Sequence, residues 1–330
     1  MINVLFTSVG RRVELIRAFR RAYKVLDLKG RIVALDVDPL APALQEADHA
    51  YVVPRVDALD YITCLTRICC AEQVDLIFPL IDPDVPILSR HREEIEATGA
   101  RLAVVSSVAA DIITDKWLTA QFFSELGIRT PQCWLPESLE ADNIEYPVFI
   151  KPRRGSAGKH AVKITGPRDL SFFCGCIDAP IIQEFLPGPE ITNDVVCDLE
   201  GEVLGVVSRQ RIEVRWGEVA KGVTVLYPGI IEACVRIARE LRAIGPITVQ
   251  CIFKHGVPHF TEINGRFGGG VPLAIAAGVD APLWLLSRAA GLPIEIPPLG
   301  TYKVGLYLTR FDESFFLSEA DVEQIRSRYI

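Results

Sequence analysis

Three polar residues alternate along one predicted strand in the last third of the chain. Glu262, Asn264 and Arg266 occupy every second position, so a strand places them on one face. Gln250, on the preceding predicted strand, adds an amide oxygen. Carboxylate and amide oxygens suit Mg²⁺, which also keeps water and substrate phosphates, and an arginine suits the same phosphate. A half-exposed strand also explains the alternation, but it explains less well the glycines at 268–270.

A lysine and a run of small residues form a second candidate site. Lys151 ends an apolar strand and is followed by a loop that contains Gly155, Ser156 and Ala157. Small residues let backbone N–H groups approach phosphate oxygens, and a lysine there can neutralise the α or β phosphate. A second strand leaves the loop, so the segment is a hairpin rather than the strand–loop–helix of a Walker motif. A mobile surface turn is the alternative.

The segment 181–190 is a third candidate, because an apolar strand leads there into a turn constrained by proline and glycine. Such a hinge can offer backbone groups to an adenine edge, and Glu190 can offer a carboxylate to a ribose hydroxyl. A plain linker between domains is the alternative.

Two further segments could contact substrate. Arg211 and Lys221 lie in a polar, basic stretch, and we predict that one of them contacts the substrate or the γ-phosphate; ordinary surface solvation is the alternative. Ser8 and Arg11 follow the first strand, where ligands gather in doubly wound sheets. Capping of the next helix by Thr7 or Ser8 is the alternative there.

The elements that must position these residues begin with an alternation of strands and helices. Apolar runs predict strands at 2–7, 31–35, 50–53, 76–80 and 101–105. Helical periodicity predicts helices at 12–24, 61–71 and 90–98. This rhythm indicates a parallel sheet with helices on both faces.

The pattern changes after residue 107. One helix is predicted at 108–126, with Asp115 and Lys116 in its middle. Strands are predicted at 146–151, 161–164, 181–185, 194–199, 203–208, 248–253, 259–263 and 303–311, with helices at 169–176, 230–244 and 281–290. A polar segment follows from 209 to 224. The domain boundaries that follow are 1–107, 108–186 and 187–330.

Taken together, these motifs resemble the ATP-grasp superfamily, in particular a single synthetase unit of the carbamoyl-phosphate synthase large subunit. The resemblance runs through nearly the whole chain in the same order. It implies that Lys116 and Lys151 bind the α and β phosphates. The other residues that it assigns to the nucleotide are Gly155, Ser156, Ala157, Gln183, Glu184, Phe185, Leu186 and Glu190. The family's usual proline between the asparagine and the arginine is Gly265 here.

The resemblance also implies a fold and an activity. The fold is α/β and α+β: a Rossmann-like (pre-ATP-grasp) domain, then two subdomains that grip ATP. The activity is ligation of a carboxylate to an amine, or to a thiol, through an acylphosphate with release of ADP and phosphate. ATP and Mg²⁺ are the expected cofactors, with two metal ions and Mn²⁺ as a substitute. Gln250, Glu262 and Asn264 would hold the metal, and Arg266 the transferring phosphoryl group or the tetrahedral intermediate.

Three other readings are weighed against this one. Carbamoyl-phosphate chemistry on bicarbonate normally uses two tandem units and an ammonia source, whereas one unit and no glutaminase nucleophile motif are visible. A non-catalytic ATP sensor or subunit would be expected to lose Glu262, Asn264 or Lys151, and all three remain. A Rossmann dehydrogenase is disfavoured because Gly10 stands without a G-x-G-x-x-G pattern.

Composition sets the broad class. The 330 residues carry a formal charge of −7 with both signs scattered, which disfavours nucleic-acid binding. There is no N-terminal export signal and no apolar run long enough to span a membrane, so no membrane partner is expected. The nine cysteines lack zinc-site spacing and indicate a reducing, cytoplasmic environment. The expected partners are small-molecule carboxylate and amine substrates, and a homodimer is a guess from base rates.

Overall fold

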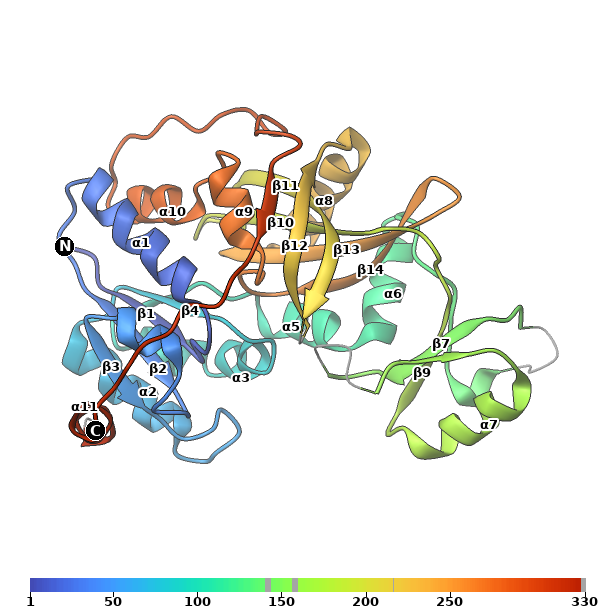
Figure 1. Ribbon diagram of the computed structural model, residues 1–330, viewed down its shortest axis with the longest axis horizontal. Helices are drawn as coiled ribbons and strands as arrows, with labels where there is room; N and C mark the ends of the chain where they lie inside the picture. The colour runs from blue at the N-terminus through green and yellow to red at the C-terminus, as the bar shows by residue number, and fades with distance from the viewer. Residues whose placement is uncertain (140–143, 156–159, 216, 328–330) are drawn as a thin grey trace.

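The computed structural model describes residues 1–139, 144–155, 160–215 and 217–327. Within these residues the chain forms a parallel sheet and two antiparallel sheets. Figure 1 shows the N-terminal domain at the lower left, the largest sheet above the centre, and a small lobe with β7, β9 and α7 at the right. We call this lobe the lid. No helix that the structure describes has the length and apolar character needed to cross a bilayer.

The N-terminal domain is the predicted doubly wound sheet. Its strands run in the order β3-β2-β1-β4-β5, all parallel: β1 Val4–Thr7, β2 Ile32–Asp36, β3 His49–Val52, β4 Leu76–Pro79 and β5 Arg101–Leu102. Its helices are α1 Val13–Val25, α2 Tyr61–Glu72, α3 Asp84–Arg90 and α4 Arg92–Glu96, with the 3₁₀ helix η1 Pro42–Glu46. The helix predicted at 90–98 therefore begins earlier, at Asp84, and is divided near residue 91.

A buried carboxyl ties two strand ends of this domain together. Asp84, which is fully buried, accepts hydrogen bonds from Thr7 Oγ1 (2.6 Å) and Ser8 Oγ (3.1 Å). These hydroxyls therefore do not cap α1, whose N-cap is Arg12 without a side-chain hydrogen bond. Burial raises the pKa of Asp84 to about 6, against the two hydrogen bonds, which lower it.

The single helix predicted at 108–126 is wrong, because it breaks at Asp115 into α5 Ser107–Thr114 and α6 Lys116–Glu125. The backbone of Asp115 is extended (φ −111°, ψ 110°), and its carboxylate accepts hydrogen bonds from the N–H groups of Trp117 and Leu118. Aspartate is a strong N-cap residue, so this local contact outweighs a continuous helical pattern.

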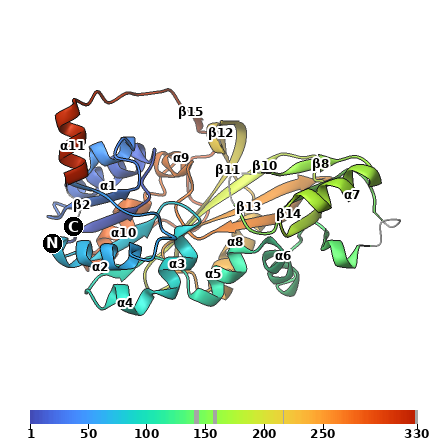
Figure 2. The ribbon, with the colours of Figure 1, turned by 90° about the horizontal axis from the view of Figure 1, so that it is seen from below.

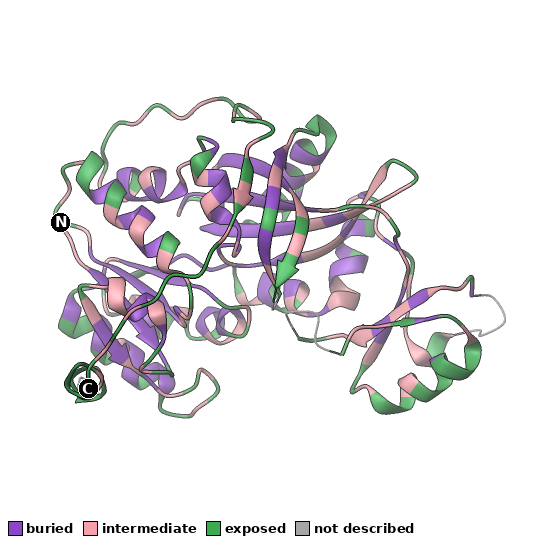
Figure 3. Ribbon diagram, viewed as in Figure 1, coloured by how far each residue is buried: buried purple, intermediate pink, exposed green. Residues whose placement is uncertain are grey.

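The lid has a four-stranded sheet in the order β6-β9-β7-β8 and a core of its own. Its elements are β6 Cys133–Trp134, η2 Pro136–Ser138, β7 Val148–Pro152, β8 Val162–Ile164, α7 Pro167–Cys176 and β9 Pro180–Glu184. The predicted hairpin is present as β7 and β8. Val148, Ile150 and Ile182 are among the residues of the small core, whereas α7 exposes most of its surface (Figure 3).

The third sheet is the largest and runs in the order β14-β13-β10-β11-β12-β15. Its strands are β10 Glu190–Cys197, β11 Val203–Arg215, β12 Glu218–Val225, β13 Pro246–Lys254, β14 Val257–Asn264 and β15 Tyr307–Thr309. The helices of this part are α8 Pro228–Glu240, α9 Val271–Ala276, α10 Ala281–Ala289 and α11 Glu319–Ser327. The hairpin β13–β14 is as predicted. After β15 the chain crosses back to the N-terminal domain, where α11 lies against β3 (Figure 2).

The polar segment after residue 208 is also strand, because β11 extends beyond the predicted end at residue 208 to Arg215 and pairs with β12. The polar residues there are satisfied within the sheet. Arg209, 2% exposed, donates from Nη2 to Asp194 Oδ1 across the β10–β11 pair at 2.9 Å. A buried arginine is tolerated here because its carboxylate partner is buried with it.

The glycines at 268–270 pack against this buried ion pair. A Cβ on Gly268 would lie 2.8 Å from Asp194 Oδ1, and one on Gly270 would lie 2.1 Å from Arg209 Nη1 and 2.7 Å from Val219 Cγ1. The adjacent Phe267 is fully buried and packs its ring against Phe78 of the N-terminal domain (5.6 Å between centroids). The segment after β14 therefore joins the two domains.

We predict that Gly270→Ala destabilises the protein by about 1–3 kcal/mol, because the methyl group overpacks a guanidinium that Asp194 holds in place. Urea unfolding measures the change. The matched control is Gly229→Ala in the first turn of α8, where a Cβ meets nothing within 4 Å; alanine there should be neutral or slightly stabilising. Equal stability of the Gly270→Ala variant and the wild type would contradict this packing.

A second prediction concerns pH. A carboxyl whose folded pKa is raised favours the protonated folded form, so the wild type loses stability as pH rises from about 4 to about 6. Asp84→Asn has no such titration. The stability of the variant relative to the wild type should therefore increase by about 2–3 kcal/mol between pH 4 and pH 7, measured by urea unfolding at each pH. A difference that does not change with pH would refute the buried, protonated carboxyl.

Candidate active site

A cleft of about 680 Å³ lies between the lid, the largest sheet and the strand ends of the N-terminal domain. Most of the residues singled out from the sequence line it: Lys116, Lys151, Gly155, Gln183, Glu190, Arg211, Gln250, Glu262, Asn264 and Arg266. Four charged residues that were not singled out line it too: Arg12, Asp82, Arg154 and Glu218. Ser156 and Ala157 lie outside the described residues.

The three predicted metal ligands come together at the β13–β14 hairpin. Gln250 lies directly opposite Glu262 in the strand register, and Asn264 follows two residues later on the same strand. The side chains of Gln250, Glu262 and Asn264 form no hydrogen bond or salt bridge to any other described residue. These oxygen atoms are therefore available to a ligand.

This donor set fits Mg²⁺ only with help from phosphates. The described part of the chain contains no cluster of three histidine, cysteine, aspartate or glutamate side chains that could hold a metal. One carboxylate and two amide oxygens leave coordination positions for phosphate oxygens and water, which is the usual way that Mg²⁺ is bound with a nucleotide.

Two lysines reach the cleft from different elements. Lys151, on β7, donates from Nζ to Gln183 Oε1 on β9 at 2.8 Å. Burial lowers the pKa of Lys151, while the Glu262 carboxylate opposes this shift. Lys116, the first residue of α6, donates to the carbonyl oxygen of Gly155 at 2.8 Å. Both cations are placed to meet an anion between the lid and the sheet.

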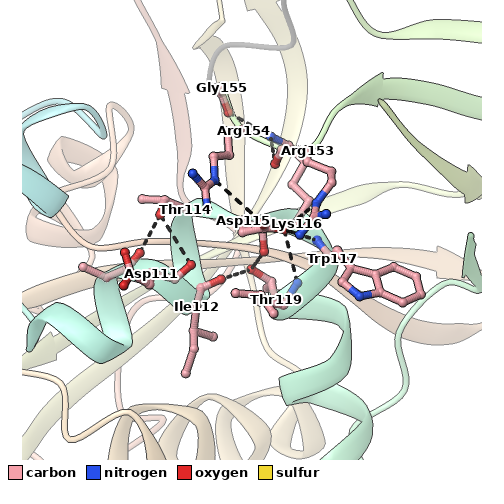
Figure 4. Close-up of polar contacts among 12 residues, drawn as sticks. Asp111, Ile112, Thr114, Asp115, Lys116, Trp117, Thr119, Arg153, Arg154 and Gly155 are labelled. Atoms are coloured by element: carbon pink, nitrogen blue, oxygen red, sulfur yellow. Dashed lines mark hydrogen bonds and ion pairs between the residues drawn. The ribbon is translucent and has the colours of Figure 1, made fainter. Parts of the chain in front are cut away.

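The break at Asp115 positions Lys116 beside the glycine loop. Figure 4 shows Arg153 and Arg154 directed towards the Asp115 carboxylate, at 2.6 and 3.7 Å. Burial of this carboxyl disfavours its charge, but hydrogen bonds from Arg153 and from backbone N–H groups outweigh burial and lower its pKa. In the sequence Asp115 adjoins Lys116, which is a predicted phosphate ligand. In the structure Asp115 connects the glycine loop to the start of α6.

The side chains of the hinge point elsewhere. Glu184 is paired with Lys254, accepts from the Gln132 N–H at 3.1 Å, and has a lowered pKa because these bonds outweigh its burial. Phe185 stacks on Phe149 of the cleft wall (5.8 Å, 14°), and Leu186 is buried. The cleft-lining residues within the described ranges do not include Glu184, Phe185 or Leu186.

Glu190 and Arg211 lie in the cleft, whereas Lys221 lies outside its described lining. Glu190 and Arg211 both line the cleft and form an ion pair of 2.6 Å. Lys221 does not line it within the described residues; its ammonium group pairs with Glu213 at 2.7 Å and is half exposed.

Apart from Arg154, the charged cleft residues that sequence reasoning missed come from the N-terminal domain and from β12. Asp82 follows β4 and forms an ion pair with Arg266 (2.8 Å); Arg12 follows β1 and pairs with Glu218 (2.6 Å). The carboxyl ends of parallel strands could have indicated Asp82 and Arg12. Glu218 carries no local signal, because only the pairing of β12 brings it here.

The other two candidates from the N-terminal loop do not line the cleft within the described residues. Ser8 donates to Asp84, as described above, and Arg11 lies 3.7 Å from Asp312 at the surface.

Gly265 is required by close packing. A Cβ there would lie 2.8 Å from Ile113 Cδ1 and 3.1 Å from Val85 Cγ1. The glycine lets α3 and α5 approach the turn between Asn264 and Arg266, beside a second cavity of about 260 Å³ that also contacts Glu262. The departure from the family's proline is thus compensated by the neighbouring helices.

Comparison with known proteins agrees with this architecture. Residues 4–103 match the PylC-like, N-terminal domain family, and residues 113–270 match the ATP-grasp domain family. A carbamoyl-phosphate synthase of Methanobrevibacter smithii is 28% identical over 45% of this chain and 41% of its own length. A formate-dependent phosphoribosylglycinamide formyltransferase of Synechococcus sp. is 31% identical over 53% of this chain and 46% of its own. The matched segments thus span less than half the length of these curated relatives.

Solved structures share the fold. Biotin carboxylase of Campylobacter jejuni superposes with a TM-score of 0.72 at 16% identity, over 92% of this chain and 74% of its own. N5-carboxyaminoimidazole synthetase of Staphylococcus aureus gives 0.72 at 15% identity, over 92% and 80%. The chain therefore carries a PylC-like N-terminal domain followed by an ATP-grasp domain, and its parallel N-terminal sheet, lid and β13–β14 hairpin follow one another in that order.

Proposed function

We propose that this protein is an ATP-dependent ligase that activates a carboxylate as an acylphosphate and transfers the acyl group to an amine, releasing ADP and phosphate. The observation that carries the proposal is that Lys116 and Lys151 line one cleft with Gln250, Glu262 and Asn264, whose side-chain oxygens have no hydrogen-bond or salt-bridge partner among the described residues. A cation set and a metal-suited oxygen set on facing walls match a polyphosphate between them.

The chain's residues supply positioning and charge. Lys116 and Lys151 neutralise the α and β phosphates, and Gln250, Glu262 and Asn264 would hold Mg²⁺, which supplies charge neutralisation at the β and γ phosphates. A substrate carboxylate oxygen attacks the γ-phosphorus while the bond to the β–γ bridging oxygen breaks and ADP leaves. Arg266 stabilises the negative charge on the transferring group.

The second half of the reaction uses the same cleft. The neutral nitrogen of the amine attacks the carbonyl carbon of the acylphosphate, phosphate leaves, and the amine loses a proton to solvent. A thiol acceptor would follow the same path. Gln250, Glu262 and Asn264 lie together on the β13–β14 hairpin. We propose that they would hold two Mg²⁺ ions, which Mn²⁺ could replace.

The setting of the enzyme is part of the proposal. All nine cysteines are free thiols, as expected in the reducing cytoplasm. A homodimer rests on the prevalence of two-fold symmetric assemblies among soluble enzymes.

A second candidate is phosphorylation of bicarbonate or carbamate, favoured by the relative named carbamoyl-phosphate synthase. It differs from the first candidate in the acid that stimulates ADP release. A sensor that binds ATP without turnover is the third candidate.

We expect Mg-ATP to release ADP and phosphate when the correct carboxylate is present, and hydroxylamine to trap the acylphosphate as a hydroxamate. Pools of amino acids, small carboxylates and bicarbonate are supplied separately. Glu262→Gln, which removes the one carboxylate of the donor set, should lower the rate by about 100-fold or more. Glu200→Gln, in an exposed pair with Arg101, is the matched control.

The outcomes separate the candidates. AMP and pyrophosphate as products would contradict the acylphosphate. ADP release stimulated only by bicarbonate would favour the second candidate. Binding of Mg-ATP without turnover in any pool would favour the sensor.

Lys151→Met should weaken Mg-ATP binding by about 10-fold or more, because a charge-assisted hydrogen bond from a desolvated cation is lost. Isothermal titration with a non-hydrolysable ATP analogue measures the affinity. Lys24→Met, at an exposed position of α1, should bind like the wild type. Unchanged affinity of the Lys151 variant would remove this lysine from the phosphate site.

A further inference from the structure

Two ion pairs lie near each other in the cleft, where the N-terminal domain meets β12 and the turn after β14. We call Arg12, Asp82, Glu218 and Arg266 the charged end of the cleft. Arg266 pairs with Asp82 at 2.8 Å, and Arg12 pairs with Glu218 at 2.6 Å. The four groups are close enough to act on one another: burial lowers the pKa of Arg12, Glu218 and Asp82 oppose this shift, and Arg266 adds to it.

Arg310 holds the charged end in position through contacts with Glu218, Glu14 and Gly269, and these contacts do not need a substrate. Arg310, just after β15, pairs with Glu218 at 3.4 Å and with Glu14 of α1 at 2.9 Å. It also donates to the carbonyl oxygen of Gly269 at 2.6 Å. Preorganised charges of this kind discriminate between ligands by charge as well as by shape.

Each residue of the Arg266–Asp82 pair has one buried polar atom without a hydrogen-bond partner among the described residues. Arg266 Nε, a donor, and Asp82 Oδ1, an acceptor, are buried and have no hydrogen-bond partner among the described residues. Buried polar atoms normally have partners, so this pair lacks one donor and one acceptor. A ligand that completes it must offer an acceptor to the arginine and a donor to the aspartate, at neighbouring positions.

The net charge of the four side chains further restricts the class of ligand that can bind there. The charged end holds two positive and two negative side chains, so a bare anion such as formate or bicarbonate would bring an uncompensated negative charge beside Asp82 and Glu218. A zwitterion adds no net charge. In an α-amino acid a single carbon separates the ammonium from the carboxylate, which suits a donor and an acceptor on side chains that already touch.

We propose that the carboxylate substrate is an α-amino acid bound as a zwitterion, with its carboxylate on Arg266 and its ammonium group on Asp82. Asn264 stands two residues before Arg266, so the carboxylate lies beside the predicted metal ligands, where it would be phosphorylated. Arg12 and Glu218 form the next wall and face the rest of the amino acid. This inference rests on the proposed ligase function and names its substrate class.

Matched pairs of acids test the proposal on the wild-type protein. ADP release from Mg-ATP is measured with each proteinogenic amino acid and with the same acid lacking the amino group, such as alanine and propionate, and with formate and bicarbonate. We expect kcat/KM for the best amino acid to exceed that for its deaminated partner by about 100-fold. The deaminated acid loses the charged hydrogen bond to Asp82 and leaves that carboxylate oxygen buried without a partner.

Asp82→Asn tests the residue. The amide keeps an oxygen for Arg266 but loses the charge that the ammonium requires. It should lower kcat/KM for the amino acid by about 10-fold or more and leave that of the deaminated acid unchanged or higher. Unchanged binding of Mg-ATP and an unchanged unfolding midpoint show that the variant is folded, and Glu200→Gln should behave as the wild type for both acids.

Different results would overturn the zwitterion site and the ligase function. Equal or better turnover of deaminated acids, formate or bicarbonate by the wild type would overturn the zwitterion site and leave the ligase standing. An equal loss for both acids in Asp82→Asn would show that Asp82 only holds Arg266 in place, and would overturn its role in binding the ammonium. No ADP release with any acid would contradict the ligase itself, and the substrate class with it.

Discussion

The segment from Asn264 to Gly270 must meet three demands at once, and the rest of the active site depends on it. It presents the last metal-suited oxygen and Arg266 to the cleft, it buries Phe267 against the phenylalanines of the N-terminal core, and its glycines rest on the buried Arg209–Asp194 pair. Gly265 completes the arrangement by admitting Ile113 and Val85. Because interiors are close-packed, a change at any of these contacts moves the oxygen set as well.

Local signals were sufficient where function depends on residues close in sequence. The alternation of Glu262, Asn264 and Arg266 needs only the period of a strand, and the parallel N-terminal sheet needs only the rhythm of apolar runs and helices. The resemblance to a known family added Lys116 and Gln183, which the structure brings to the same cleft. The roles of these residues remain predictions that the substitutions above address.

Non-local pairing explains what was missed. Glu218 reaches the cleft because β11 runs seven residues further than its apolar part and β12 folds back along it, and a polar stretch gives no sign of this. The same register points Lys221 towards Glu213 instead of the cleft. The predicted single helix failed at Asp115 because the N-cap hydrogen bonds and the ion pair with Arg153 outweigh the helical periodicity of the sequence.

The cleft is thereby assembled from parts that are held together in different ways. The elements that carry the oxygen set and the charged end pack in apolar cores shared with the N-terminal domain. The lid has a separate core. Polar contacts connect the lid to the rest: Asp115 with Arg153, Glu184 with Lys254, and the Gly188 N–H with the carbonyl oxygen of Phe253. If Lys151 binds phosphate as proposed, a bound nucleotide would add its contacts to these few links. Nucleotide binding would then be coupled to the position of the lid.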